Sequence, residues 1–405
     1  MAAYAGDFGQ LDASALAALV RRCEVSPLEL VDDAIRRLEA VNGPLNAVIT
    51  PMFEQARERA QGVLPAGPFR GVPFLMKDFA AEVAGVPFYE GSRFLDGYRP
   101  AVDSEIYRRF NAAGLVTIGK TNLPELAIGV TTEPARFGAT HNPWDLARTP
   151  GGSSGGAGAA VAARVVPMAH GNDVGGSIRI PASACGLVGL KPTRGRGTLA
   201  PHYGDILAGF FVEHALTRSV RDCAALLDVV AAPGVGEPYV APPPARPYAE
   251  EVTLPPGRLR IGYATTTPLG DALDAECVAA IESTAALLAE LGHEVVEAAP
   301  VFDAMELWTK YTTLLAALVA WAVADWSRRL GRTPTEAHFE PFVWAFAERG
   351  RGVAAADYLL AMQDVQAQVR AMAAFWEHHD LWLTTTLGQP PVPLGTLVYT
   401  GDPFE

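Results

Sequence analysis

Lysine is scarce in this chain of 405 residues, and the balance of charge is acidic. Only four of the 32 basic residues are lysines, and the other 28 are arginines. With 45 acidic residues the formal net charge is −13. Nucleic acids and anionic membrane surfaces attract basic patches, so this balance argues against either as the main partner. A coding bias towards arginine explains the scarcity, yet it draws attention to each lysine that remains. They are Lys77, Lys120, Lys191 and Lys310.

Cysteine is also rare, and long apolar runs are absent. The four cysteines lie far apart and form no CxxC motif, which argues against a zinc site and against a dense disulfide framework. We expect buried free thiols in a reducing cytosol. The first residues lack the features of a signal peptide, and the longest strongly apolar run, Leu314 to Ala324, has 11 residues, too few to span a bilayer. These absences predict a cytoplasmic protein with no metal or other cofactor. The cysteines are Cys23, Cys185, Cys223 and Cys277.

Helical and strand-like segments alternate along the chain, which predicts an α/β fold. Apolar residues make up 49 % of the chain, enough for a large core. Ser26-Pro27-Leu28-Glu29 is a capping box that begins a helix, and Asn42-Gly43-Pro44 ends it. This alternation is typical of a sheet covered by helices on both faces. Further helices are expected at 103–113, 219–231 and 274–291, and strands at 46–50, 71–76, 115–118, 259–263 and 381–385.

The composition changes at three places along the chain. From Thr149 to Gly197 glycine and serine dominate and strong periodicity is lost. The stretch from Pro233 to Gly257 carries eight prolines, which predicts a linker or a long surface excursion. Residues 303–379 are rich in helix-forming segments.

Two segments rich in glycine and serine are candidates for a catalytic site. Gly151-Gly152-Ser153-Ser154-Gly155-Gly156 matches the G-x-S-x-G elbow of α/β-hydrolases, but no hydrophobic strand precedes it. A phosphate-binding loop is disfavoured because no Lys-Ser or Lys-Thr pair follows the glycines. Composition alone favours a flexible turn for this segment.

The second segment, residues 171–181, places glycines directly before Ser177. Glycines allow backbone N–H groups to converge on an oxyanion, because no side chain obstructs the approach. A serine nucleophile needs a base, and the histidines offer no convincing one, since His170 has no recognisable partner in the sequence. The residues alone therefore indicate two serines, converging amides and a scarce lysine in one half of the chain.

Together these segments resemble the amidase signature family of serine hydrolases. GVPFLMKD (71–78), GGSSGG (151–156) and GNDVGGSIRIPAS (171–183) stand in the family's order, and Ser153 and Ser177 lie 24 residues apart, as they do there. The resemblance covers about residues 10–395 and implies a single domain, 1–405, built on a large mixed β-sheet covered by helices on both faces. Its catalytic core is expected at about 65–230 and its substrate pocket in the helix-rich region 303–379. Further matches are GKTNLPELA (119–127), GLVGLKPTRGR (186–196) and SVRDCAALLDVV (219–230).

The resemblance also implies a role for each residue of a Ser-Ser-Lys triad. Ser177 corresponds to the nucleophile that forms an acyl-enzyme. Ser153 corresponds to the bridging serine, which follows a cis peptide bond in the family, and Lys77 to the base that deprotonates Ser177 through Ser153. Asp173 and Arg179 are expected to brace the nucleophile loop by pairing. The oxyanion hole would be formed by the backbone amides of Val174, Gly175, Gly176 and Ser177.

The role of Lys77 makes a physical demand. A free lysine has a pKa of about 10.4, so a lysine base that works near neutral pH needs a pKa of about 7. Burial or nearby positive charge must favour the neutral amine. Asp78 would oppose this, but the alternation of an extended strand places its side chain on the opposite face.

These observations predict an amidase that acts on a small uncharged linear or cyclic amide. Within the family, residues 131–156 and 169–196 are most similar to bacterial hydrolases of cyclic amides. The alternatives are the glutaminase subunit of a tRNA-dependent amidotransferase and a catalytically inactive binding protein on the same fold. The expected partners are a small-molecule amide and a second copy of the chain in a homodimer. Family members continue for about 80 residues or more beyond Asp380–Thr384, so the resemblance implies that a C-terminal part of the fold is lacking here.

Overall fold

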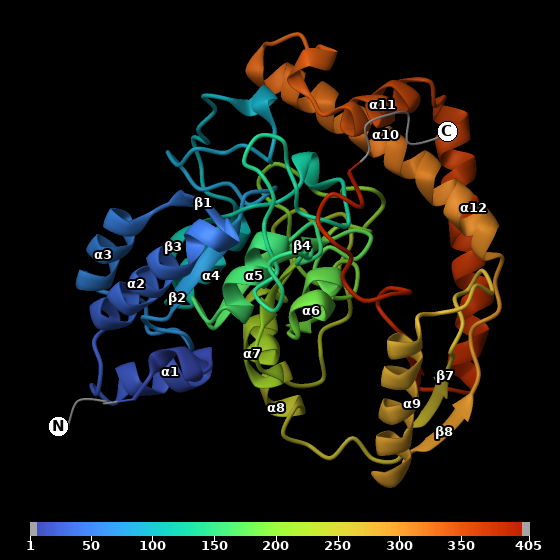
Figure 1. The fold of residues 1–405 in the computed structure, drawn as a ribbon, viewed down its shortest axis with the longest axis horizontal. Coiled ribbons are helices and arrows are strands. Elements are labelled where there is room, and N and C mark those ends of the chain that lie inside the picture. The colour runs from blue at the N-terminus through green and yellow to red at the C-terminus, as the bar shows by residue number, and fades with distance from the viewer. Residues whose placement is uncertain (1–5, 399–405) are drawn as a thin grey trace. The chain divides into compact units, whose positions relative to one another are not determined.

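The computed structural model describes residues 6–398, which divide into two compact units. Unit 1 contains the residues up to Thr253, the segment Leu330–Glu340 and the segment that starts at Pro393. Unit 2 contains Leu254–Arg329 and Pro341–Val392. The bar in Figure 1 colours unit 1 mainly blue to green and unit 2 mainly orange to red. The division after Thr253 falls within the proline-rich stretch 233–257.

Unit 1 is built on a six-stranded mixed sheet with the strand order β1-β3-β2-β4-β6-β5. Its central strands β3, β2 and β4 run parallel, whereas β1, β6 and β5 pair antiparallel with their neighbours. The predicted mixed sheet is thus confirmed. The strands are β1 (Val48–Pro51), β2 (Pro73–Lys77), β3 (Val116–Thr121), β4 (Met168–Asp173), β5 (Val188–Gly189) and β6 (Val212–Thr217).

Helices cover both faces of this sheet (Figure 1), as predicted. In β2, Leu75 packs into one apolar cluster with α2, α3 and α5, whereas Phe74 and Met76 pack into the other with α1, α4 and α7. Successive strand residues point to opposite faces, and both faces are therefore buried. The helices are α1 (Ala13–Arg21), α2 (Pro27–Leu45), α3 (Phe53–Gln61), α4 (Glu105–Ala112), α5 (Gly155–Ala162), α6 (Arg179–Cys185), α7 (Val220–Val230) and α8 (Tyr248–Glu251). Short 3-10 helices occur at Phe8–Gln10, Arg93–Leu95, Glu125–Ala127 and Glu336–His338.

The segment rich in glycine and serine contains more regular structure than its sequence indicates. The capping box at Ser26 forms as predicted, but α2 runs through Asn42-Gly43-Pro44 to Leu45, so the predicted end of the helix was too early. By contrast α5, β4 and α6 all lie within residues 149–197, where periodicity is weak. Every residue of α5 from Gly155 to Val161 is buried, so the helix has no polar face to produce an amphipathic pattern.

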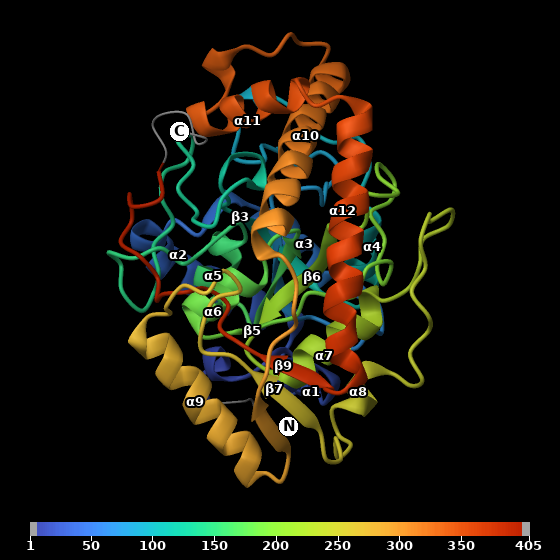
Figure 2. The same ribbon diagram turned by 90° about the vertical axis from the view of Figure 1, so that its right-hand side faces the viewer.

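Unit 2 contains a three-stranded parallel sheet with the order β8-β7-β9. Helix α9 lies along this sheet, as Figures 1 and 2 show. The strands are β7 (Arg260–Tyr263), β8 (Glu294–Glu297) and β9 (Leu381–Leu383). The helices are α9 (Ala275–Glu290), α10 (Ala304–Leu330), α11 (Pro341–Arg351) and α12 (Ala355–Ala373), followed by a 3-10 turn at Ala374–Glu377.

Helix α10 is long and apolar enough to cross a membrane when judged by length and composition alone. It is the one helix of this kind among the described residues, and 22 % of its most apolar window is buried. A single such helix is weak support for a membrane span, because core helices of soluble proteins meet the same criterion. In the sequence, the strongly apolar run Leu314 to Ala324 is too short to span a bilayer, whereas the helix that contains it is longer.

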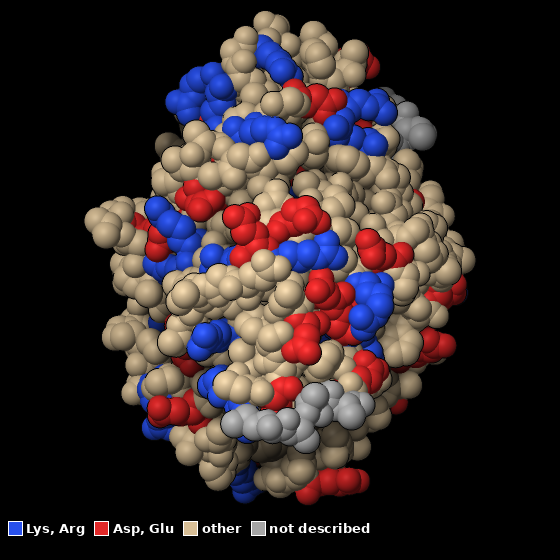
Figure 3. Space-filling model, turned by 90° about the vertical axis from the view of Figure 1, so that its left-hand side faces the viewer, with Lys and Arg blue, Asp and Glu red and all other residues tan. Residues whose placement is uncertain are grey.

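Charged side chains of both signs are interspersed on the face shown in Figure 3. A few acidic side chains pair with arginines a turn away on the same helix, as Asp33 does with Arg36 and Arg37. The four cysteines are free, as expected, but only Cys185 and Cys223 are buried, whereas Cys23 is exposed and Cys277 is partly exposed.

Candidate active site

Lys77 ends strand β2 and lies fully buried in unit 1. Its Nζ lies 2.7 Å from Ser153 Oγ and 2.6 Å from Asn172 Oδ1. The ring of Phe79 lies 5.7 Å from the same nitrogen. The fold therefore brings together the predicted lysine and the first predicted serine, which are 76 residues apart in sequence.

Burial lowers the pKa of Lys77 from 10.5 to about 7, although the charges of Asp173, Glu213 and Glu90 oppose this shift. Transfer of an ammonium group into a low-dielectric interior disfavours the charged form, which accounts for the direction. The amine is thus partly neutral at pH 7, as a general base requires. The pKa of Lys77 therefore has the value that a lysine base needs near neutral pH.

Asp78 does not interfere, because its side chain forms a buried ion pair with Lys120. It also accepts a hydrogen bond from the Tyr89 amide at 3.0 Å. Lys120 lies 4.2 Å from the centre of the Phe88 ring. Lys120 therefore has a structural role, and it neutralises the acid next to Lys77.

The turn that carries Ser153 is held by close backbone contacts. The Gly152–Ser153 peptide bond is cis, as the resemblance implied. A Cβ atom at Gly152 would lie 2.5 Å from the carbonyl oxygen of Thr131, so only glycine fits this close approach. Thr132 Oγ1 donates a hydrogen bond to the Gly151 carbonyl at 2.9 Å. The glycines of GGSSGG thus allow the turn to pack directly against the backbone of the segment around Thr131.

Asn172 is a site residue that sequence reasoning missed. Its Oδ1 accepts a hydrogen bond from Lys77 Nζ, and its Nδ2 donates to the Phe79 carbonyl at 3.2 Å, which fixes the orientation of the amide. A neutral amine that donates one proton to Asn172 can direct its lone pair at the Ser153 hydroxyl. The only available signal was its position within the GNDVGGSIR segment.

His170 also has partners that the sequence did not reveal. Its Nδ1 accepts a hydrogen bond from the Lys77 backbone amide at 3.3 Å, and its Nε2 lies 3.5 Å from Glu213 Oε2. Because Nδ1 is an acceptor, the proton of the neutral ring belongs on Nε2, facing the carboxylate. His170 therefore supports the strand that carries Lys77 rather than acting as the base for Ser177.

Ser177 lies half-buried in the loop between β4 and α6. Its carbonyl oxygen accepts a hydrogen bond from the Ser154 amide at 3.2 Å, which joins the two serine segments. Among the described residues, no hydrogen bond connects Ser177 Oγ with Ser153 Oγ. Catalytic hydrogen bonds are often long before substrate binds, so this geometry is compatible with the predicted relay.

Asp173 braces the loop that carries Ser177, as predicted. It accepts hydrogen bonds from the amides of Gly176 at 2.8 Å and Ile178 at 3.1 Å, and it forms a two-point ion pair with Arg179. Burial by itself would raise the pKa of Asp173, but the Arg179 side chain and the two amides outweigh it and hold the pKa below its usual range. The carboxylate is therefore ionised near neutral pH.

This bracing changes one part of the predicted oxyanion hole. The Gly176 N–H already donates to Asp173, so it is engaged in this structure. Val174, Gly175 and Ser177 are the predicted donors whose amides have no such acceptor among the described residues. Gly176 itself has a φ of 129°, and a Cβ there would lie 2.7 Å from Ile180 Cδ1. Glycine at 176 therefore shapes the loop, and the amides on either side remain available.

The bracing role of Asp173 is testable by replacing it with asparagine. We expect Asp173→Asn to lower the free energy of unfolding by about 2 kcal/mol, because the hydrogen bonds to a charged acceptor are lost. Asp173 has a lowered pKa, so its contribution is present above pH 3.8 and is lost as the pH falls through its folded-state pKa. Urea unfolding of both proteins at pH 7 and in acid measures this difference.

The exposed Asp357 near the start of α12 provides a matched control. Asp357→Asn should leave the free energy of unfolding within about 0.5 kcal/mol of the parent. Equal stability of Asp173→Asn and Asp357→Asn at pH 7 would show that Asp173 does not brace the loop.

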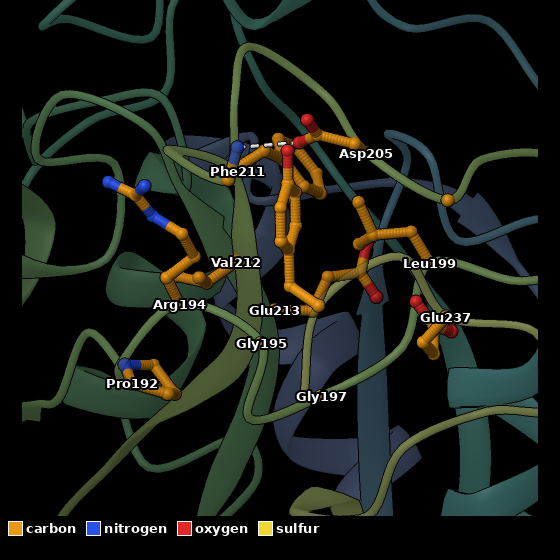
Figure 4. Close-up of a pocket in the computed structure, with 13 residues that line it drawn as sticks. Pro192, Arg194, Gly195, Gly197, Leu199, Asp205, Phe211, Val212, Glu213 and Glu237 are labelled. Carbon is orange, nitrogen blue, oxygen red and sulfur yellow. Dashed lines mark hydrogen bonds between the residues drawn. The ribbon is translucent and has the colours of Figure 1, made fainter. Parts of the chain in front are cut away.

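A separate pocket lies beside strand β6 (Figure 4). Its lining includes Arg194, Asp205 and Glu213, and Asp205 accepts a hydrogen bond from the Gly209 amide. The lining contains neither Lys77 nor either of the two serines. Residues 6–398 contain no group of three or more His, Cys, Asp or Glu side chains that could hold a metal ion.

The fold and the site define a class of protein. A mixed α/β sheet presents a buried lysine of lowered pKa to a serine, and a second serine lies in the loop that Asp173 braces. The family model described as Amidase matches residues 29–405, and the chain belongs to this family. It is an amide hydrolase that acts on carbon–nitrogen bonds.

Individual relatives agree with this assignment. The 6-aminohexanoate-cyclic-dimer hydrolase of Paenarthrobacter ureafaciens is 43 % identical over 395 residues, which cover 96 % of this chain and 80 % of that protein. The solved structure of a 6-aminohexanoate cyclic dimer hydrolase complexed with substrate matches with a TM-score of 0.93 and 42 % identity, over 96 % of this chain and 82 % of that one. A bacterial aryl acylamidase of the amidase signature family matches with a TM-score of 0.88 and 27 % identity, over 96 % and 82 % of the two chains.

Proposed function

We propose that the chain hydrolyses a small uncharged amide through a Ser-Ser-Lys triad formed by Ser177, Ser153 and Lys77. The observation that carries this proposal is the 2.7 Å contact between the buried Lys77 amine and Ser153 Oγ. A lysine with a pKa of about 7 can accept a proton at neutral pH, whereas a solvated lysine cannot. The carbonyl of Ser177 is tied to the turn of Ser153 through the Ser154 amide.

The proton passes along the triad in two steps. Lys77 Nζ, oriented by Asn172, takes the proton of Ser153 Oγ, which in turn takes the proton of Ser177 Oγ. The Ser177 oxygen then attacks the amide carbon, and a tetrahedral intermediate with a negatively charged oxygen forms. The backbone amides of Val174, Gly175 and Ser177 stabilise that oxygen, each donor being worth about 3–4 kcal/mol.

The intermediate collapses when the leaving nitrogen takes a proton from Ser153, and Lys77 returns its proton to Ser153, so that both groups are neutral again. The carbon–nitrogen bond breaks, and an ester between Ser177 Oγ and the acyl group remains. Water then attacks this ester with the same lysine acting as base, which releases the acid and restores the enzyme.

The substrate class is part of the proposal. A relative that is 43 % identical is named a 6-aminohexanoate-cyclic-dimer hydrolase, and we propose a small linear or cyclic amide of this kind as the substrate. Purified protein should release a primary amine from the cyclic dimer of 6-aminohexanoate or from a small uncharged linear N-alkyl amide. Glutamine is the matched comparison: ammonia from glutamine without hydrolysis of either amide would contradict the proposal and indicate a glutaminase.

The rate should depend on pH through Lys77. The base is the neutral amine, so kcat/KM should rise as the pH increases through about 7 and level off above it. The measurement is kcat/KM from pH 5 to pH 9 at constant ionic strength. A kcat/KM that still rises about tenfold per pH unit between pH 8 and pH 9, as for a solvated lysine with a pKa of about 10.4, would show that Lys77 is not the base or is not buried in the working enzyme.

The proposal also covers the cellular compartment of the protein and its oligomeric state. The free cysteines favour a reducing compartment, and we propose the cytoplasm. A homodimer remains a prediction, as does the expectation that nucleic acid and membranes are not partners.

A further inference from the structure

Two segments far apart in sequence meet at the carboxyl groups of Glu125 and Glu340, both in unit 1. The Glu340 backbone amide donates to Glu125 Oε2 at 2.6 Å. Glu340 Oε1 accepts a hydrogen bond from the Ala135 amide at 2.7 Å. One residue therefore binds both ends of the loop formed by residues 125–135.

The middle of this loop contacts the turn that carries Ser153. Thr132 Oγ1 donates to the Gly151 carbonyl at 2.9 Å, and the Thr131 hydroxyl lies 2.7 Å from that of Thr149. Thr149 Oγ1 in turn accepts a hydrogen bond from the Gly151 amide at 3.1 Å. The Thr131 carbonyl also approaches Gly152 so closely that a Cβ there would lie 2.5 Å from its oxygen. A displacement of the loop would therefore displace Ser153.

We propose that Glu340 is a positioning residue for amide hydrolysis, because it clamps both ends of loop 125–135 and thereby holds the Gly151–Ser153 turn in place. This inference rests on the proposed function, in which Ser153 transfers the proton of Ser177. Glu340 reaches the site only through the loop and touches neither serine.

Other groups around the two carboxyls support a dedicated clamp. Arg332 fixes the segment Leu330–Glu340 to the rest of unit 1. Its guanidinium donates to the carbonyls of Phe94 and Asp96 at 3.1 Å each. Burial raises the pKa of Glu125 to about 7, although the Ser92 hydroxyl opposes this shift, and burial raises the pKa of Glu340 as well. Burying two neighbouring carboxyl groups costs stability, so their presence is better explained by the contacts they make to the loop.

Substitution of Glu340 tests the clamp. Glu340→Ala removes the acceptor for the Ala135 amide, and we expect kcat to fall about tenfold while KM stays within twofold. Glu340→Gln keeps an oxygen acceptor at the same place and should restore kcat to within about twofold of the parent. Glu336→Ala, at an exposed acid on the same segment, should leave both constants unchanged. A parental kcat in Glu340→Ala, or equal losses in the alanine and glutamine variants, would overturn the proposal.

Hydrogen exchange of the Ala135 amide provides a readout that does not depend on catalysis. Its measurement in the parent protein needs no variant to fold. In the parent protein this amide should exchange at least about tenfold more slowly than an unprotected loop amide, and Glu340→Ala should remove that protection. An unprotected Ala135 amide in the parent protein would overturn the clamp. If Ser153→Ala retained activity, the proposed function would fail, whereas the exchange rate would still decide whether the clamp exists.

Discussion

Replacing Ser177 with alanine is expected to lower kcat/KM for amide hydrolysis by at least about a hundredfold, the scale of losing a nucleophile. The side-chain oxygen Oγ is the only atom of Ser177 that can form the acyl bond. The alanine variant retains the backbone amide at this position. The variant should therefore still bind the substrate. A fluorophosphonate probe, which forms a covalent bond with activated serines, should label the parent protein and not the variant.

Ser183 provides the matched control, because it is an exposed serine six residues further along on α6. Ser183→Ala should keep both activity and labelling. Full activity in Ser177→Ala would exclude the acyl-enzyme mechanism, whatever its effect on labelling. Ser153→Ala should show a loss similar to that of Ser177→Ala if the relay is correct. When catalytic groups work as a unit, removing one of them costs about as much activity as removing the whole unit.

Replacing Lys77 with arginine is also expected to lower kcat/KM by at least about a hundredfold, the scale of losing a general base. Arginine keeps the positive charge, but its pKa lies above about 12, so it cannot provide a neutral amine near pH 7. The planar guanidinium would also have to fit beside Ser153 and Asn172 in a fully buried site. The measurement is steady-state hydrolysis at pH 8, above the pKa of about 7 for Lys77.

The same exchange at Lys310 controls for the change of residue type. Lys310 is a partly exposed lysine on α10 whose Nζ pairs with Asp364 at 2.7 Å. Lys310→Arg should keep kcat/KM within about twofold of the parent, because an exposed ion pair contributes little and arginine preserves it. If Lys77→Arg had the same kcat/KM as Lys310→Arg, proton transfer to Lys77 would not be part of the reaction.

Much of the fold follows from local sequence signals. The capping box at Ser26 predicted the start of α2, and the strand preceding Lys77 was predicted to within about two residues. These elements have strong start signals or clear apolar runs. The elements that carry much of the site, α5 and β4, were not predicted, because each is buried on all sides and so lacks an alternating or helical polar pattern.

The candidate site was predictable only in part, for a similar reason. The resemblance to the amidase signature family implied that Lys77, Ser153 and Ser177 share one site, and the structure brings the first two into contact. Asn172 and His170 contact Lys77 because β4 lies beside β2, a neighbour relation that no local pattern specifies. The engagement of the Gly176 amide by Asp173 likewise depends on the path of the loop. Glu340 was not predicted either, because it meets the loop 125–135 across about 200 residues of sequence.

The central claim is that Ser177 becomes acylated during amide hydrolysis. The most direct measurement is intact mass spectrometry of the protein quenched with acid during turnover of a small amide, followed by peptide mapping. We expect a mass increase equal to that of the acyl group, located on the peptide that contains Ser177 and absent from Ser177→Ala. Turnover without any covalent adduct under conditions that trap esters, or an adduct on another residue, would contradict the account.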